Sequence, residues 1–80
     1  MGLELGRYLR KCRLKSKLTQ RDVALHLGHT SAQYVSNVER GLARPSKGGI
    51  RTYCVLVGAR PLTVREMWVN EVRSELNGVL

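Results

Sequence analysis

Aromatic residues and long apolar segments are scarce in this chain of 80 residues. It has no phenylalanine, one tryptophan and three tyrosines, and aromatic residues make up 5% of the chain. No apolar run is long enough to span a membrane or to form the core of a signal peptide. We therefore expect a cytoplasmic protein with no membrane partner.

Cysteine is also rare, since Cys12 and Cys54 are the only two in the chain. Together with His26 and His29 they do not have zinc-finger spacing, so we expect two buried thiols and no metal or disulfide. The six acidic residues are scattered, and no Ser/His/Asp or Cys/His group and no glycine-rich phosphate loop is recognisable. We therefore expect neither an enzyme nor a cofactor.

Acidic residues are outnumbered by basic ones. The 14 Lys and Arg against 6 Asp and Glu give a net charge of +8 and a pI near 10.4. Residues 1–60 hold 12 basic and 3 acidic residues, whereas residues 61–80 hold 2 and 3. This distribution suits a single domain that meets a polyanion on one side and a second copy of itself on the other. A basic protein without such a role would show the same charge.

Two short helices joined by a tight turn are predicted within residues 18–41. Apolar residues recur at helical spacing in both, as Val23, Ala24 and Leu27 and then as Val35 and Val38. Thr19 is expected to N-cap the first helix in a capping box with Asp22. Gly28 would end that helix with a positive φ, and Ser31 would N-cap the second. This arrangement is typical of a helix-turn-helix unit.

Three further helices complete the prediction of an all-α, five-helix domain over residues 1–80. The first covers residues 3–16, with Leu5, Leu9 and Cys12 buried and Arg13 on the exposed basic face. Another runs from Lys47 to Val57 with Ser46 as its cap, and buries Ile50, Tyr53, Cys54 and Val57. The last runs from Val64 to Leu76 and begins with a capping box of Thr63 and Glu66.

Several of these residues match the pattern of a known family. They are Leu18-Thr19-Gln20, Ala24, Leu27-Gly28 and Val38-Glu39-Arg40-Gly41, with Leu5-Gly6, Leu9 and Arg13 in the first helix. In them the chain resembles lambda-repressor/Cro-like (XRE-type) helix-turn-helix transcription regulators. It departs from common members by one extra residue in positions 29–31, without which Tyr34 and Asn37 would fill the core positions of Val35 and Val38. The resemblance implies a lambda-repressor-like fold in a prokaryotic or phage-infected cell.

A recognition helix from Ala32 to Arg40 is expected to enter the major groove of double-stranded DNA. The base-contact candidates, on the side opposite Val35 and Val38, are Gln33, Asn37, Ser36 and Ala32. Gln33 leads because its amide can pair bidentately with adenine. The phosphate candidates are Gln20, Arg21, Ser31, Tyr34, Arg40, Arg44 and Lys47. The resemblance implies that Gln20 also braces the recognition helix, and Glu39 is interpreted as an internal ion-pair partner of a first-helix arginine.

The last helix has a wider apolar face than packing on the core requires. The candidates for a homodimer interface are therefore Trp68, Val69, Val72 and Leu76, with Leu80, and ordinary core packing is the alternative.

The glycine pair Gly48-Gly49 either lets the backbone approach a phosphate or is a tolerated local cost. The resulting hypothesis is a dimeric repressor on an inverted-repeat operator. The alternatives are an antitoxin or adaptor whose main partner is a protein (a toxin or polymerase), and non-specific nucleic-acid packaging.

Overall fold

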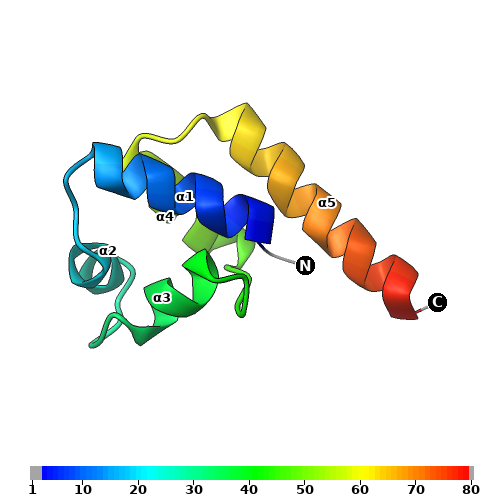
Figure 1. Ribbon diagram of the computed structural model, residues 1–80, viewed down its shortest axis with the longest axis horizontal. Helices are drawn as coiled ribbons and strands as arrows, with labels where there is room; N and C mark the ends of the chain where they lie inside the picture. The colour runs from blue at the N-terminus through cyan, green and yellow to red at the C-terminus, as the bar shows by residue number, and fades with distance from the viewer. Residues whose placement is uncertain (1–2, 80) are drawn as a thin grey trace.

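The protein folds into five helices, and the longest of them lies at the C-terminal end (Figure 1). The computed structural model describes the backbone of residues 3–79 and the side chains of residues 4–75. The helices are α1 (Leu3–Lys15), α2 (Gln20–His26), α3 (Gln33–Glu39), α4 (Lys47–Val57) and α5 (Pro61–Val79), and residues 3–79 contain no strand. The prediction of an all-α, five-helix fold is confirmed.

The core forms where the apolar faces of the five helices meet. α1 contacts α3, α4 and α5, and α3 also contacts α2. The buried apolar residues are Leu5, Leu9, Val23, Ala24, Val35, Val38, Ile50, Tyr53, Cys54, Val57, Ala59 and Val64. Burying one Val, Leu, Ile or Phe side chain contributes about 1.5–3 kcal/mol. Because Val35 and Val38 both lie in this core, the register predicted from one extra residue in the turn is confirmed.

Two residues of α1 differ from the prediction. Arg13, expected on the exposed face, is only 7% exposed, because its guanidinium pairs with the buried Glu39 carboxylate. Cys12, expected to be buried, is half-buried. Cys54 is buried as predicted, and its thiol donates to the Ala59 carbonyl at 3.3 Å. Both cysteines are free thiols.

Gly6 lets α1 approach α3 more closely than any other residue would. A Cβ atom at this position would lie 2.5 Å from the Val38 carbonyl oxygen and 2.6 Å from that of Glu39. Those distances are shorter than real Cβ contacts, so a larger residue would force the two helices apart. The close approach brings the C-terminal end of α3 directly onto α1.

Three helix ends follow the predicted chemistry. The Thr19 hydroxyl accepts from the Asp22 backbone N–H at 3.0 Å, and the Thr19 N–H donates to Asp22 Oδ2 at 2.9 Å. The bond from the Thr19 N–H, together with the Thr19 side chain, lowers the pKa of the Asp22 carboxyl. Gly28 takes a φ of 84° after α2, and Ser46 caps α4 by accepting from the Gly49 N–H at 3.1 Å.

Two predicted caps are wrong. α3 begins at Gln33 and ends at Glu39, and the residue before it is Ala32, which makes no side-chain cap, so Ser31 is not the N-cap. α5 begins at Pro61, so Thr63 lies inside its first turn and the capping box with Glu66 is not the start of the helix. Proline has a φ preset for a first helical position and no N–H to satisfy there, which favours the earlier start.

None of the described helices has both the length and the apolar content needed to cross a bilayer.

Candidate nucleic-acid interface

α3 has a buried side and an outward side, although it is only seven residues long. Val35, Val38 and Glu39 are between 0% and 5% exposed. Gln33 is exposed and Asn37 is half-buried on the outward side. So short a helix is not stable alone in water. Its position therefore depends on the contacts of its buried side.

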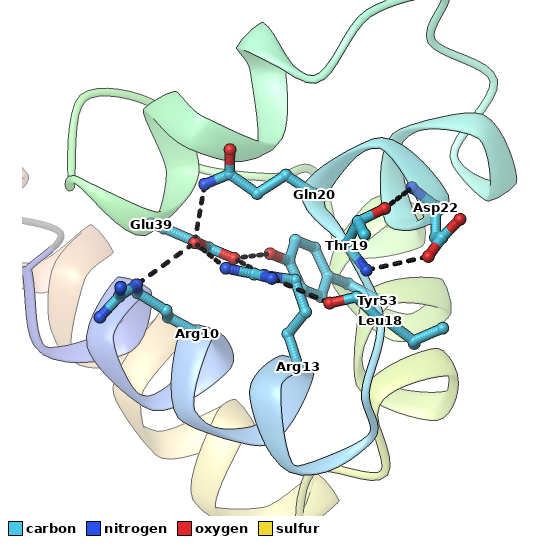
Figure 2. Close-up of polar contacts among 8 residues, drawn as sticks. All are labelled: Arg10, Arg13, Leu18, Thr19, Gln20, Asp22, Glu39 and Tyr53. Atoms are coloured by element: carbon cyan, nitrogen blue, oxygen red, sulfur yellow. Dashed lines mark hydrogen bonds and ion pairs between the residues drawn. The ribbon is translucent and has the colours of Figure 1, made fainter.

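The Glu39 carboxylate joins α3 to three other helices (Figure 2). Arg13 of α1 donates from Nε to Oε2 at 2.6 Å and from Nη2 to Oε1 at 3.1 Å. Gln20 of α2 donates from Nε2 to Oε1 at 3.0 Å, and the Tyr53 hydroxyl of α4 donates to Oε2 at 3.2 Å. The ion pair of Glu39 with a first-helix arginine is therefore confirmed, and so is the contact by which Gln20 braces α3.

These donors offset the cost of burying charge. The side chains of Arg13 and Glu39 are 8% and 2% exposed, and a buried pair is tolerated when its remaining polar atoms are also hydrogen-bonded. Arg13 meets this condition through Nη1, which donates to the Leu18 carbonyl at 2.9 Å. Burial and the neighbouring Glu39 charge raise the pKa of Tyr53 far above its usual value, so its hydroxyl remains a donor. The end of α3 is thus fixed from α1, α2 and α4 together.

The outward side of α3 carries a second cluster of polar side chains. The Asn37 Oδ1 atom accepts from Gln33 Nε2 at 2.9 Å and from Arg40 Nη2 at 3.1 Å. The Asn37 amide oxygen therefore links Gln33 and Arg40 into one cluster of polar side chains. The structure therefore brings together two predicted base-contact residues and one predicted phosphate-contact residue. Ser36, also a base candidate, is half-buried beside them on α3.

The turn before α3 positions Tyr34. The rings of His29 and Tyr34 are stacked, with centroids 4.2 Å apart and an angle of 16° between their planes. Burial raises the pKa of the half-buried Tyr34 hydroxyl, which keeps it a neutral hydrogen-bond donor. Ser31 is exposed and Ala32 is half-buried at the start of α3, so both lie at the end of the helix that the sequence predicts to approach the bases.

The other predicted phosphate-contact residues occupy different settings. Arg21 and Lys47 are exposed. Gln20 is half-buried, and Figure 2 shows its Oε1 atom directed away from Glu39. Arg44 forms an ion pair with Glu75 of α5. The charge of Arg44 is therefore already paired within the protein.

A family model described as "Helix-turn-helix domain" matches residues 4–68. The chain belongs to this family. It is similar to the restriction-modification controller protein C.AhdI from Aeromonas hydrophila, with 27% identity and a TM-score of 0.67 over 78% of this chain and 92% of that chain. It is also similar to the clp gene regulator ClgR from Corynebacterium glutamicum, with 28% identity and a TM-score of 0.69 over 98% of this chain and 87% of that chain.

A third structure, the restriction-modification controller protein C.Esp1396I, is 20% identical with a TM-score of 0.65 over 88% of each chain, and supports the fold alone. A comparison with curated protein sequences found no match. The predicted resemblance to XRE-type helix-turn-helix regulators is confirmed by these comparisons. Residues 4–68 therefore have the fold of a DNA-binding helix-turn-helix domain.

In this helix-turn-helix domain the predicted dimer residues lie on α5. Trp68, Val69 and Val72 are half-buried. Trp68 also packs against the core, and its indole N–H donates to the Pro45 carbonyl at 2.8 Å. A groove between α4 and α5 is lined by Ile50, Val64, Trp68 and Val69, among others. The side chains of Leu76 and Leu80, which were predicted to extend this face, lie outside the described residues.

Sequence reasoning missed two features that position α3 in this domain. Helical spacing predicts Tyr53 as part of the apolar stripe of α4, but its hydroxyl is also a donor to Glu39. Gly6 matches the family pattern, but the pattern does not indicate that this residue permits the contact of α1 with α3. A buried tyrosine normally requires a hydrogen-bond partner, which is the signal that could have pointed to a polar group opposite α4.

Proposed function

We propose that the protein is a sequence-specific, double-stranded DNA-binding transcription regulator that reads bases through α3. The observation that carries this proposal is the outward cluster of Gln33, Asn37 and Arg40 on a helix whose opposite side is fixed in the core. Glutamine and asparagine amides can pair bidentately with adenine in the major groove, and arginine pairs with guanine or phosphate. The net charge of +8 supplies the long-range attraction to DNA.

The regulator would act as a homodimer on an inverted-repeat operator. α5 supports this proposal, because Val69 and Val72 leave part of their apolar surface exposed on one side of the helix. A two-fold dimer would place two copies of α3 about 34 Å apart, which is one turn of DNA. Repression is the favoured mode, since occupying a promoter needs no further contact. The similar structures, named as controller and regulator proteins, agree with this proposal.

Selection of bound sequences from a random DNA pool tests the proposal directly. A regulator should enrich a short inverted repeat and prefer it over random DNA by about 10³-fold or more. The matched control is a duplex of the same composition in which one half-site is scrambled. A preference of about tenfold or less would refute sequence-specific regulation and favour charge-driven packaging.

Sedimentation equilibrium separates the homodimer from the alternative of a protein partner. A regulator of the proposed kind should dimerise alone and bind the selected operator with two subunits per site. A chain that stays monomeric and binds DNA weakly until another protein is added would instead favour the antitoxin or adaptor hypothesis.

A further inference from the structure

The loop between α3 and α4 is attached to α5 by three contacts. The loop carries Arg44 and Pro45, and Figure 1 shows it in green between α3 and α5. The Trp68 indole N–H donates to the Pro45 carbonyl at 2.8 Å. The Arg44 guanidinium carbon lies 5.9 Å from the centroid of the Trp68 ring, and Arg44 Nη1 forms an ion pair with Glu75 Oε2. The C-terminal helix therefore holds both the backbone and the charge of this loop.

Helical spacing explains why α5 can make all three contacts. Trp68 and Glu75 are seven residues apart, which places them two turns apart on the same face. Glu71 lies between them, is 8% exposed, and has an Oε1 atom without a hydrogen-bond partner among the described residues. The bond with Arg44 lowers the pKa of the Glu75 carboxyl, whereas burial raises the pKa of the Glu71 carboxyl. The charge of Arg44 is therefore paired with that of Glu75.

We propose that Glu75 competes with a DNA phosphate for the guanidinium of Arg44. This inference rests on the proposed function, in which Arg44 contacts the DNA backbone. Both acceptors are anionic oxygens that suit the planar fork of the guanidinium, so binding of one weakens binding of the other. The negative charge of Glu75 would also repel an approaching phosphate. The ion pair on α5 therefore lowers the affinity for DNA.

The Arg44–Glu75 ion pair and the Trp68–Pro45 hydrogen bond differ in strength, and this difference indicates what each one does. The side chains of Arg44 and Glu75 are 30% and 59% exposed, so their ion pair is weakened by water and salt and can exchange. The half-buried Trp68 contacts the Pro45 carbonyl, which does not depend on the charge of Arg44. Trp68 is thus the fixed anchor of the loop, and Glu75 is the partner that Arg44 leaves when it binds DNA.

Replacing Glu75 with glutamine tests the competition, with Glu66→Gln as the matched control. Both substitutions remove one negative charge from an exposed residue of α5, but only Glu75 is paired with Arg44. The measurement is the dissociation constant for the selected operator at low salt, by fluorescence anisotropy. Glu75→Gln should bind about 2–5-fold more tightly than Glu66→Gln, the range expected for loss of an exposed ion pair. This difference in affinity between the two variants should disappear when both also carry Arg44→Ala.

Three outcomes would overturn the competition. Equal affinities of the Glu75 and Glu66 variants would show that only the net charge of α5 matters. A difference in affinity that persists when both variants carry Arg44→Ala would show that Glu75 acts on another group. Weaker binding by Glu75→Gln would show that the ion pair positions Arg44 for DNA. Failure of the wild type to prefer the selected operator would instead refute the proposed function, and the competition with it.

Discussion

Substitution of Glu39 by glutamine is expected to destabilise the protein strongly. The change keeps the size of the side chain but removes the charge opposite Arg13, whose side chain is only 8% exposed. Breaking a buried ion pair by removing one partner costs about 3–5 kcal/mol, because the other charge stays buried without compensation. A domain of 80 residues has a total stability of roughly 4–12 kcal/mol. The expected loss is therefore a large part of the whole.

Thermal unfolding followed by far-UV circular dichroism at pH 7 measures this loss. In a domain of this size each kcal/mol changes the Tm by roughly 4–8 °C, so the Tm should fall by at least about 12 °C. Glu66→Gln is the control, because Glu66 is exposed on α5 and the same chemical change there should stay within about 0.5 kcal/mol. A Glu39→Gln variant with the same Tm as this control would refute the stabilising role of the ion pair.

A double-substitution cycle separates the ion pair from the other contacts of Glu39. Arg13→Gln combined with Glu39→Gln leaves neither charge unpaired, so its cost should be well below the sum of the two single costs. Gln20 and Tyr53 donate to different oxygens of Glu39, and glutamine retains only one, so one of these donors loses its acceptor in both Glu39 variants. Because this loss occurs in the single and the double variant alike, it cancels in the cycle. Additive costs would contradict direct coupling of Arg13 with Glu39.

Three other predictions concern DNA reading, assembly and pH. Gln33→Ala should cost about 1–3 kcal/mol on the operator and relax the preference at one base pair, and equal weakening on random DNA would contradict base reading. Val72→Glu should yield a folded monomer in sedimentation equilibrium, and an unchanged dimer would place Val72 outside the interface. Burial raises the pKa of the Glu71 carboxyl, so the wild type is destabilised above that pKa and relieved as the pH falls through it. Glu71→Gln should therefore raise the Tm at pH 7 and lose this advantage near pH 4, and a pH-independent difference would rule out titration of Glu71.

The parts of the fold that depend on neighbours in the sequence were predictable. The spacing of Val35 and Val38 identified the buried side of α3, because helical periodicity places residues three apart on one face. Thr19 and Ser46 identified the starts of α2 and α4, because an N-cap bonds only to the next few backbone groups. The start of α5 was mispredicted because two local signals, Pro61 and Thr63, competed and the earlier one determined it.

The parts that depend on distant contacts were not predictable from local pattern. Arg13 occurs among other basic residues of α1, and only its bond to a residue 26 positions away accounts for its burial. The need for glycine at position 6 arises from the α3 carbonyls that lie against it. In the candidate interface, the spacing of Val35 and Val38 predicted an outward side of α3, but not that Asn37 accepts hydrogen bonds from both Gln33 and Arg40. Nor did it indicate that Arg44 is paired with α5.

The two sides of α3 have separable effects on DNA binding if the proposed function holds. A substitution on the outward side, such as Gln33→Ala, removes a contact without changing the core, so affinity should fall while the Tm stays near that of the wild type. Glu39 is buried and accepts a hydrogen bond from Gln20, so its replacement changes both the buried contacts of α3 and the contact with the start of α2. Its effect on affinity should therefore be compared at a temperature where the variant is fully folded. A defect that remains there would mean that the buried carboxylate orients α3 on the DNA, whereas normal affinity would limit its role to stability.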